Sequence, residues 1–118
     1  MQYLLLIYAN EHETQAMNPA ARGTMLQEYV DFTKSLVQAG QFKAADRLRA
    51  VSTASTVRVR NGKSIVTDGP FAETREQLGG YYQIEAKNLD EALAVAARIP
   101  SAKYGSIEVR PIWPAEEY

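Results

Sequence analysis

The stretch IVTDGPFAETREQLGGYYQIEA, residues 65–86, contains parts of two predicted strands and the whole loop between them. The first strand, residues 64–67, is rich in β-branched side chains and ends at the consecutive turn formers Asp68, Gly69 and Pro70. The second strand begins at Gly80 and continues to residue 86. A polar connection this long is either a functional loop or an ordered linker with a solvated run of charges, since short turns suffice to join neighbouring strands.

A β-hairpin is predicted immediately before the loop. Residues 56–60 alternate apolar and polar side chains, and Asn61-Gly62 is the strongest two-residue hairpin signal. Residues 63–67 must therefore return antiparallel to residues 56–60.

Two amphipathic helices are predicted on either side of this region. The first begins with Asn18 as N-cap and Pro19 as first helical residue, and it ends at Gly40. The second begins at Asn88, with Glu91 three positions later, and it ends at Pro100. Their apolar stripes contain Met25, Leu26, Tyr29, Val30, Phe32, Thr33, Leu36 and Val37 in the first helix, and Leu89, Ala92, Leu93, Ala96 and Ile99 in the second.

The remaining strands are predicted at residues 2–9, at residues 42–48 on a sheet edge, and at residues 106–112. The order β, α, β, inserted hairpin, β, α, β predicts an α+β fold of the ferredoxin-like, split βαβ type, with both helices on one sheet face. Residues 1–118 suit a single domain. Because the first strand is apolar on both faces, we expect a homodimer in which two sheets meet face to face.

Composition narrows the classes of function. The formal net charge is −1, with 13 basic and 14 acidic residues well mixed, which argues against nucleic acid as a partner. The chain contains no cysteine, so thiolate catalysis and metal sites built on sulfur are excluded. No apolar stretch is long enough to span a membrane, and residues 1–9 lack the features of a signal peptide. We therefore expect a cytoplasmic protein without membrane association, cofactor or metal.

The run from Asp68 to Tyr82, DGPFAETREQLGGYY, resembles the signature of the DGPF branch of the YCII-related proteins. The resemblance covers almost the whole chain, including YLLLIY at residues 3–8, TVRVRNG at residues 56–62, RIP at residues 98–100 and EVRP at residues 108–111. It implies a dimeric α+β barrel of ferredoxin-like subunits. It implies no particular reaction, although some members are encoded beside extracytoplasmic-function sigma factors and the fold is shared with small isomerases and monooxygenases.

In the wider YCII family, a histidine on the first helix and an aspartate before the proline that ends the second are suspected of acting as an acid–base pair. Tyr29 and Ile99 stand near these positions here. Neither residue of that pair is present, so any acid–base chemistry needs other residues.

The loop itself supplies the candidate catalytic carboxylates, Asp68 and Glu73. Asp68 either fixes the turn through hydrogen bonds to loop N–H groups, which is the commoner role, or acts as a general base beside the apolar Phe71. Arg75 either binds an anionic ligand or pairs with neighbouring glutamates. The residues expected to shape the loop are Gly69, Pro70, Phe71, Gly79 and Gly80.

Aromatic and basic residues elsewhere are candidates for ligand binding. Tyr8, Tyr29 and Tyr81 either line a pocket or belong to the core and dimer interface, and Arg110 is a candidate carboxylate clamp. His12, the only histidine, is more often a solvated side chain than a catalytic one in such a polar segment.

Two functions of different classes follow. The first is a site for a small aromatic or enolisable ligand, anionic ones included, in a cleft beside the loop from Asp68 to Gly80, with cofactor-independent proton transfer, lyase or isomerase chemistry. The second is a non-enzymatic regulatory module that uses the same loop to bind another protein, such as a sigma factor.

Overall fold

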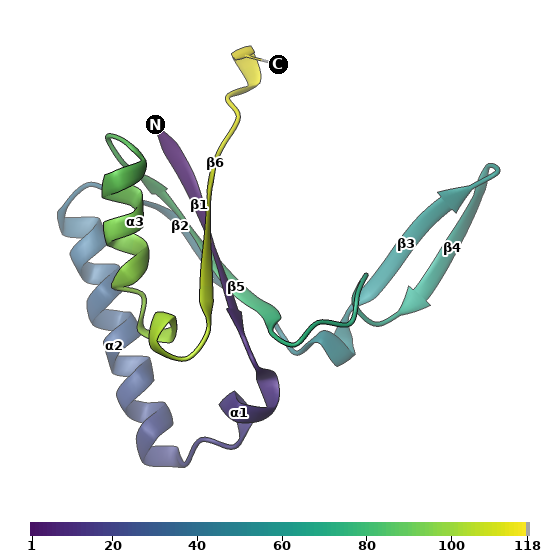
Figure 1. Cartoon of the computed structure of the whole chain (residues 1–118), viewed down its shortest axis with the longest axis horizontal. Coiled ribbons are helices and arrows are strands. Elements are labelled where there is room, and N and C mark those ends of the chain that lie inside the picture. Colours follow the sequence, from purple (N-terminus) through teal and green to yellow (C-terminus); the bar gives the residue numbers. More distant parts are fainter. Residues whose placement is uncertain (118) are drawn as a thin grey trace.

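The computed structural model describes residues 1–117 and contains a four-stranded antiparallel sheet, two packed helices and a separate β-hairpin (Figure 1). The main sheet is formed by β1 (Gln2–Ala9), β2 (Phe42–Arg47), β5 (Gln77–Glu85) and β6 (Ser106–Pro111), and the hairpin by β3 (Ser55–Arg60) and β4 (Lys63–Asp68). The helices are α1 (Glu11–Gln15), α2 (Pro19–Gln38) and α3 (Leu89–Ala97), and the 3-10 turns are η1 (Val51–Thr53), η2 (Pro100–Lys103) and η3 (Ala115–Glu117).

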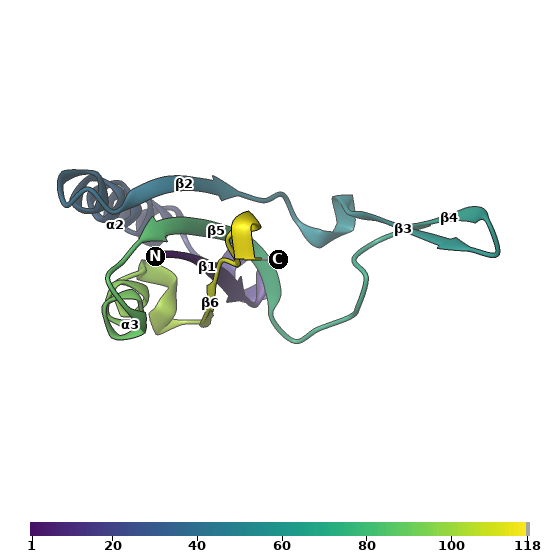
Figure 2. The same ribbon diagram turned by 90° about the horizontal axis from the view of Figure 1, so that it is seen from above.

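In the strand order β2-β5-β1-β6, the central strands are β5 and β1 and the edge strands are β2 and β6. Figures 1 and 2 show α2 and α3 on the same side of the sheet. This is the split βαβ arrangement predicted from the order of the elements. The α+β fold with an inserted hairpin is therefore confirmed.

The two faces of β1 have different environments because successive side chains of a strand point to opposite sides. Tyr3, Leu5 and Ile7 are buried beneath the helices. Leu4, Leu6 and Tyr8 point to the other side, which neither α2 nor α3 covers. We call this side the open face; cross-strand pairing adds Tyr81, Gln83, Glu85, Glu108, Arg110, Ala44 and Asp46 to it.

The core between sheet and helices is smaller than the apolar stripes of the sequence suggest. On α2, Phe32 and Leu36 are buried, whereas Leu26 is 65% exposed. On α3, Val95 is buried and was missing from the predicted stripe, whereas Leu89 and Leu93 are about half exposed. The stripes are wider than the contact because a curved helix surface meets the sheet along a narrow line.

The hairpin has the predicted turn. Asn61 and Gly62 have φ angles of 52° and 74°, the left-handed conformation that a type I′ turn requires at both positions. The strands are each one residue longer than predicted at the end away from the turn. Both views show the hairpin extending away from the main sheet, on the side opposite to the helices.

Two larger differences from the prediction concern the segment after β1 and the start of β5. The segment from Asn10 to Asn18 contains the short helix α1, capped by the Asn10 side chain, which accepts a hydrogen bond from the Glu13 N–H at 3.1 Å. β5 begins at Gln77, so Gly79 and Gly80 belong to a strand and do not shape the loop. A Cβ at Gly80 would lie 2.8 Å from the Asp46 carbonyl oxygen, so glycine permits the close approach of β2 at this position.

Candidate functional site

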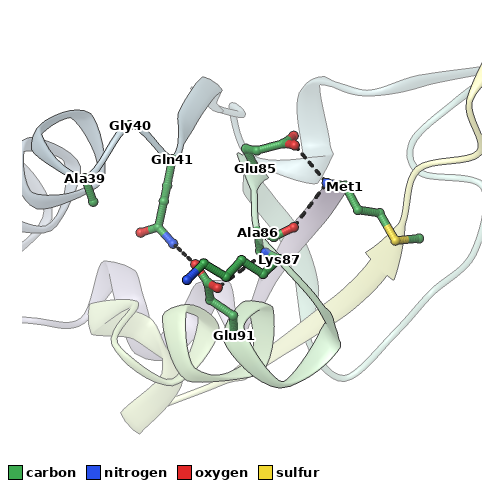
Figure 3. A pocket seen from close by; sticks show the side chains of 8 residues that line it. All are labelled: Met1, Ala39, Gly40, Gln41, Glu85, Ala86, Lys87 and Glu91. Atoms are coloured by element: carbon green, nitrogen blue, oxygen red, sulfur yellow. Dashed lines mark hydrogen bonds and ion pairs between the residues drawn. The ribbon is translucent and has the colours of Figure 1, made fainter.

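Two hollows stand out on the surface, and the larger lies where β5 leads into α3 (Figure 3). Its volume is about 230 Å³. Its polar groups are paired with one another: Gln41 donates to Glu91 at 2.8 Å, and the amino group of Met1 contacts Glu85 at 2.7 Å. Apart from the Lys87 ammonium, these contacts satisfy the polar side chains that line it, and we interpret this hollow as the junction of three chain segments.

The second hollow lies between α1, α2 and η2 and has a volume of about 110 Å³. We call it the Ser101 groove; its lining consists of Asn10, Glu13, Thr14, Met17, Met25, Ser101 and Tyr104. Its surface is mainly apolar, with a few polar groups among thioethers and an aromatic ring. This is the usual composition of a small-molecule site, although the volume is below the ~300 Å³ typical of drug-sized ligands.

A pair of hydroxyl groups lies at the wall of the Ser101 groove. The Ser101 Oγ is 2.6 Å from the OH of Tyr29, and Tyr29 is half-buried with its ring stacked on Tyr82, centroid to centroid 6.5 Å. Burial raises the pKa of Tyr29 above its usual value of 10.0, although the hydrogen bond with Ser101 opposes this shift. Tyr29 therefore remains a neutral phenol at physiological pH and positions the Ser101 hydroxyl.

Local sequence explains how Ser101 comes to face α2. Pro100 is buried and starts the 3-10 turn that directly follows α3, so the chain folds back toward α2. The end of the same turn is held by Lys103, whose Nζ donates to Glu28 of α2 at 3.1 Å. This exposed ion pair raises the pKa of Lys103, chiefly through the hydrogen bond to Glu28.

Asn10 connects the groove to the loop that follows β4. Its side-chain amide donates to the carbonyl oxygen of Arg75 at 3.3 Å, while its side-chain oxygen caps α1. Nearby, the Glu11 N–H donates to Gln77 at 2.9 Å, and Ser106 donates to Glu76 at 2.8 Å. The last residues of the loop are therefore anchored beside the groove.

The candidate catalytic carboxylates lie elsewhere. Asp68 and Glu73 are exposed and line neither hollow, and their carboxylates form no hydrogen bond or ion pair with any other described residue. Phe71 is 79% exposed, so it gives Asp68 no apolar enclosure. Both expected environments of Asp68 are thus absent from the single chain.

The turn after β4 is formed by the backbone. The Gly69 N–H donates to the Ala54 carbonyl at 2.7 Å, and the Thr56 hydroxyl donates to the Gly69 carbonyl at 2.9 Å. The expectation that the Asp68 side chain fixes this turn is wrong. Gly69 has φ = 107°, a conformation that other residues rarely adopt, and Pro70 follows it half-buried.

Arg75 was expected to bind a ligand or to pair with Glu73 or Glu76. Its guanidinium is exposed and unpaired within residues 1–117, and only its backbone carbonyl is anchored. The loop is therefore held through its backbone and through Glu76 and Gln77.

Three other candidates lie together on the open face, on the opposite side of the sheet from Tyr29. Tyr81 donates to Asp46 at 2.5 Å, and this hydrogen bond is the main cause of the raised pKa of Tyr81. Arg110 pairs with Glu108, with its Nε donating at 2.8 Å. Tyr8 is half-buried between β5 and β6. The candidates thus form three groups, which a single chain does not bring together.

Sequence reasoning missed the residues of the Ser101 groove other than the neighbouring Tyr29. Asn10 followed by Glu13 was a readable helix-cap signal for α1. Ser101 and Met25 meet only through tertiary packing, which no local pattern reports. His12 is exposed on α1 and lines neither hollow.

Two further features are absent from the described part of the chain. No three histidine or acidic side chains there lie close enough to hold a metal ion. None of the helices there is both long and apolar enough to cross a membrane.

Comparison with known proteins gives two findings. The model of the YCII-related domain matches residues 1–116. A protein of Rhizobium meliloti (strain 1021), described as "Uncharacterized protein R00369", is 39% identical over 114 residues, which cover 95% of this chain and 92% of that protein.

Proposed function

The chain belongs to the YCII-related family, and we propose that it binds a small organic molecule in the Ser101 groove. One observation carries this proposal: the half-buried phenol of Tyr29 fixes the Ser101 hydroxyl, at 2.6 Å, against an otherwise mainly apolar hollow. Such a site favours a ligand with an apolar body and one hydroxyl or carbonyl group. The volume of about 110 Å³ suits a single small ring.

The charge of the groove bears on the ligand class. Glu13 lines it, and no cationic side chain does. We therefore expect neutral aromatic or enolisable ligands to bind more tightly there than anionic ones. If proton transfer takes place at this site, Glu13 is the carboxylate in reach, whereas Asp68 and Glu73 are not among the lining residues.

Binding of two probes tests the proposal. Phenol and benzoate are titrated into the ¹⁵N-labelled protein, and backbone amide shifts are followed by NMR. We expect phenol to shift the amides of Asn10, Ser101 and Tyr104, and benzoate to bind more weakly. Ser101→Ala should weaken phenol binding by about threefold to tenfold, the value of one hydrogen bond.

Tyr82→Phe is the matched control. The Tyr82 OH forms a similar hydroxyl pair with Thr33, at 2.7 Å, but neither residue lines the groove. This variant should bind phenol as the parent does. The proposal is wrong if phenol shifts are scattered over the surface or are the same in the parent and in Ser101→Ala.

We further propose that two copies associate through the open face as a dimeric α+β barrel. The apolar centre of that face, Leu4, Leu6 and Tyr8, supports this assembly, because a sheet face with such residues is normally covered. In this dimer Tyr8, Tyr81 and Arg110 would lie at the seam between the subunits. Within the family, the run from Asp68 to Tyr82 supports the DGPF branch.

A protein-binding module, with a sigma factor as the partner that the resemblance suggests, is the second candidate function. The observation in its favour is the loop after β4, where Phe71 is 79% exposed and the charges of Glu73 and Arg75 are unpaired within the described chain. Phe71→Ser separates the candidates: it should abolish binding of a protein partner and leave the phenol titration unchanged.

A further inference from the structure

The hairpin of β3 and β4, which we call the arm, forms a sheet of its own, separate from the main sheet. Its strands pair only with each other, and every residue of β4 is exposed. Both views show it projecting beyond the main sheet (Figures 1 and 2). An isolated two-stranded hairpin is marginally stable in water, so an ordered arm of this kind is expected to rest on another surface.

The arm has one apolar face and one basic face. Cross-strand partners share a face, and the pairs Val57–Val66 and Val59–Ser64 form what we call the valine face, with the pair Ser55–Asp68 at its end near the loop. Val57, Val59 and Val66 are 61%, 59% and 65% exposed. The pairs on the other face include Arg58–Ile65 and Arg60–Lys63. A strand pattern of this kind is typical of a hairpin that is covered on one side.

The surface area of the chain indicates how much is left uncovered. The accessible surface is 8407 Å² for a chain of 13.1 kDa, against about 6,400 Å² expected for a compact monomer. The Cα radius of gyration is 16.4 Å, against about 13.5 Å for a compact chain of this length. The excess of about 2,000 Å² exceeds the ~800 Å² that each partner buries in a standard stable interface.

The same chain also offers a surface for the arm. The open face has Leu4, Leu6 and Tyr8 at its centre, and the arm leaves the sheet on that side, away from the helices. A chain that carries both a projecting apolar arm and an apolar sheet face is self-complementary, so one two-fold axis covers both surfaces in both copies.

The arm and the rest of the chain carry opposite net charges. The arm carries three basic side chains, Arg58, Arg60 and Lys63, against the single carboxylate of Asp68, a net charge of +2. Because the whole chain has a net charge of −1, the remainder carries −3. On the open face, Glu85 is paired with the Met1 amino group and Glu108 with Arg110, so Asp46, which accepts from the Tyr81 hydroxyl, is the carboxylate there without a cationic partner among the described residues. Opposite net charges steer the encounter of two copies, although the basic side chains themselves lie on the face of the arm opposite to the valine face.

We propose that the valine face of each arm packs on the open face of a second copy, so that the two chains interlock. This inference rests on the dimer proposed above and names the segment that holds it together. The arm thereby acquires the packing that it lacks in a single chain, and the loop that follows β4 is carried toward the partner.

Two adjacent substitutions test the arm. Val66→Glu and Thr67→Glu add the same charge to neighbouring exposed residues on opposite faces of β4. The dissociation constant of the dimer is measured by sedimentation equilibrium. We expect Val66→Glu to weaken dimerisation about tenfold or more, because it places a carboxylate in an apolar interface, and Thr67→Glu to have little effect.

The possible results of this measurement distinguish the role of the arm from the existence of the dimer. If the parent is a dimer and both variants dissociate alike, the arm does not hold the interface and the inference is wrong, while the dimer stands. If the parent is monomeric at all concentrations, both are wrong. Circular dichroism should show intact folding in both variants, since the arm makes no contact with the core.

Discussion

At the residue scale, apolar character predicted burial only where a side chain points at the sheet. Leu36 is fully buried and Leu26, ten residues earlier on the same helix, is 65% exposed. Both belonged to the predicted stripe, because periodicity fixes the side of the helix but not the width of its contact. The candidate site shows the same limit: Tyr29 was identifiable as a residue that points inward, whereas its partner Ser101 was not.

The phenol of Tyr29 gives a prediction about alkaline pH. Its pKa is raised by burial, so the neutral form is favoured in the folded state. Because protonation of Tyr29 is linked to folding, its contribution to stability is complete below the unfolded pKa of about 10. This contribution is lost as the pH rises through the higher pKa of the folded state. We expect thermal stability to fall above about pH 10, and to fall less steeply in Tyr29→Phe.

The measurement is the melting temperature between pH 8 and pH 12, with Tyr104→Phe as a control because Tyr104 is 62% exposed. Burial also raises the pKa of Tyr82. Part of the pH dependence of the melting temperature should therefore remain in Tyr29→Phe. Identical pH profiles for the parent and Tyr29→Phe would contradict the prediction.

At the scale of elements, local signals were sufficient wherever a boundary is fixed by local chemistry. Asn18 caps α2 by accepting from the Ala21 N–H at 2.8 Å, and Asn61-Gly62 forms the predicted turn. The start of β5 was predicted three residues late because Gln77, Leu78 and Gly79 have no strong strand preference. Pairing with β1 extends the strand to Gln77, and that information lies in the tertiary structure.

Asn10 links one of these elements to the loop, which gives a second prediction. Asn10→Ala removes both the cap of α1 and the contact with the Arg75 carbonyl. We expect hydrogen exchange in residues 75–77 and in α1 to become about fivefold faster, corresponding to about 1 kcal/mol for the loss of a cap. Asn88→Ala, which removes the cap of α3, should leave residues 75–77 unchanged. Equal exchange in both variants would show that Asn10 does not anchor the loop.

At the scale of the whole molecule, the sequence predicted the hairpin but not where it lies relative to the main sheet. Alternation in Val57, Arg58 and Val59 reports an amphipathic strand, and nothing local distinguishes a neighbouring strand of the same chain from a second copy. The position of the arm, away from the main sheet, is therefore the part of the fold that sequence reasoning was least able to foresee.

A dimer held by the arm predicts that stability depends on concentration. Unfolding of a dimer releases two chains, so mass action favours the unfolded state on dilution. We expect tenfold dilution to lower the melting temperature by about 3 °C, as the free energy involved is about 1.4 kcal/mol. In Val66→Glu the dependence should be much weaker in the same concentration range. A parent melting temperature that is constant over a hundredfold dilution would contradict the prediction.

The outer edges of β3 and β4 pair with no other strand in the described chain. Unsatisfied edges next to exposed valines are templates on which further strands can add. A newly synthesised chain can therefore add to a growing fibre until it forms the dimer. Because the dimer covers the exposed valines, a chain that is kept from dimerising should form more insoluble material than one that dimerises freely.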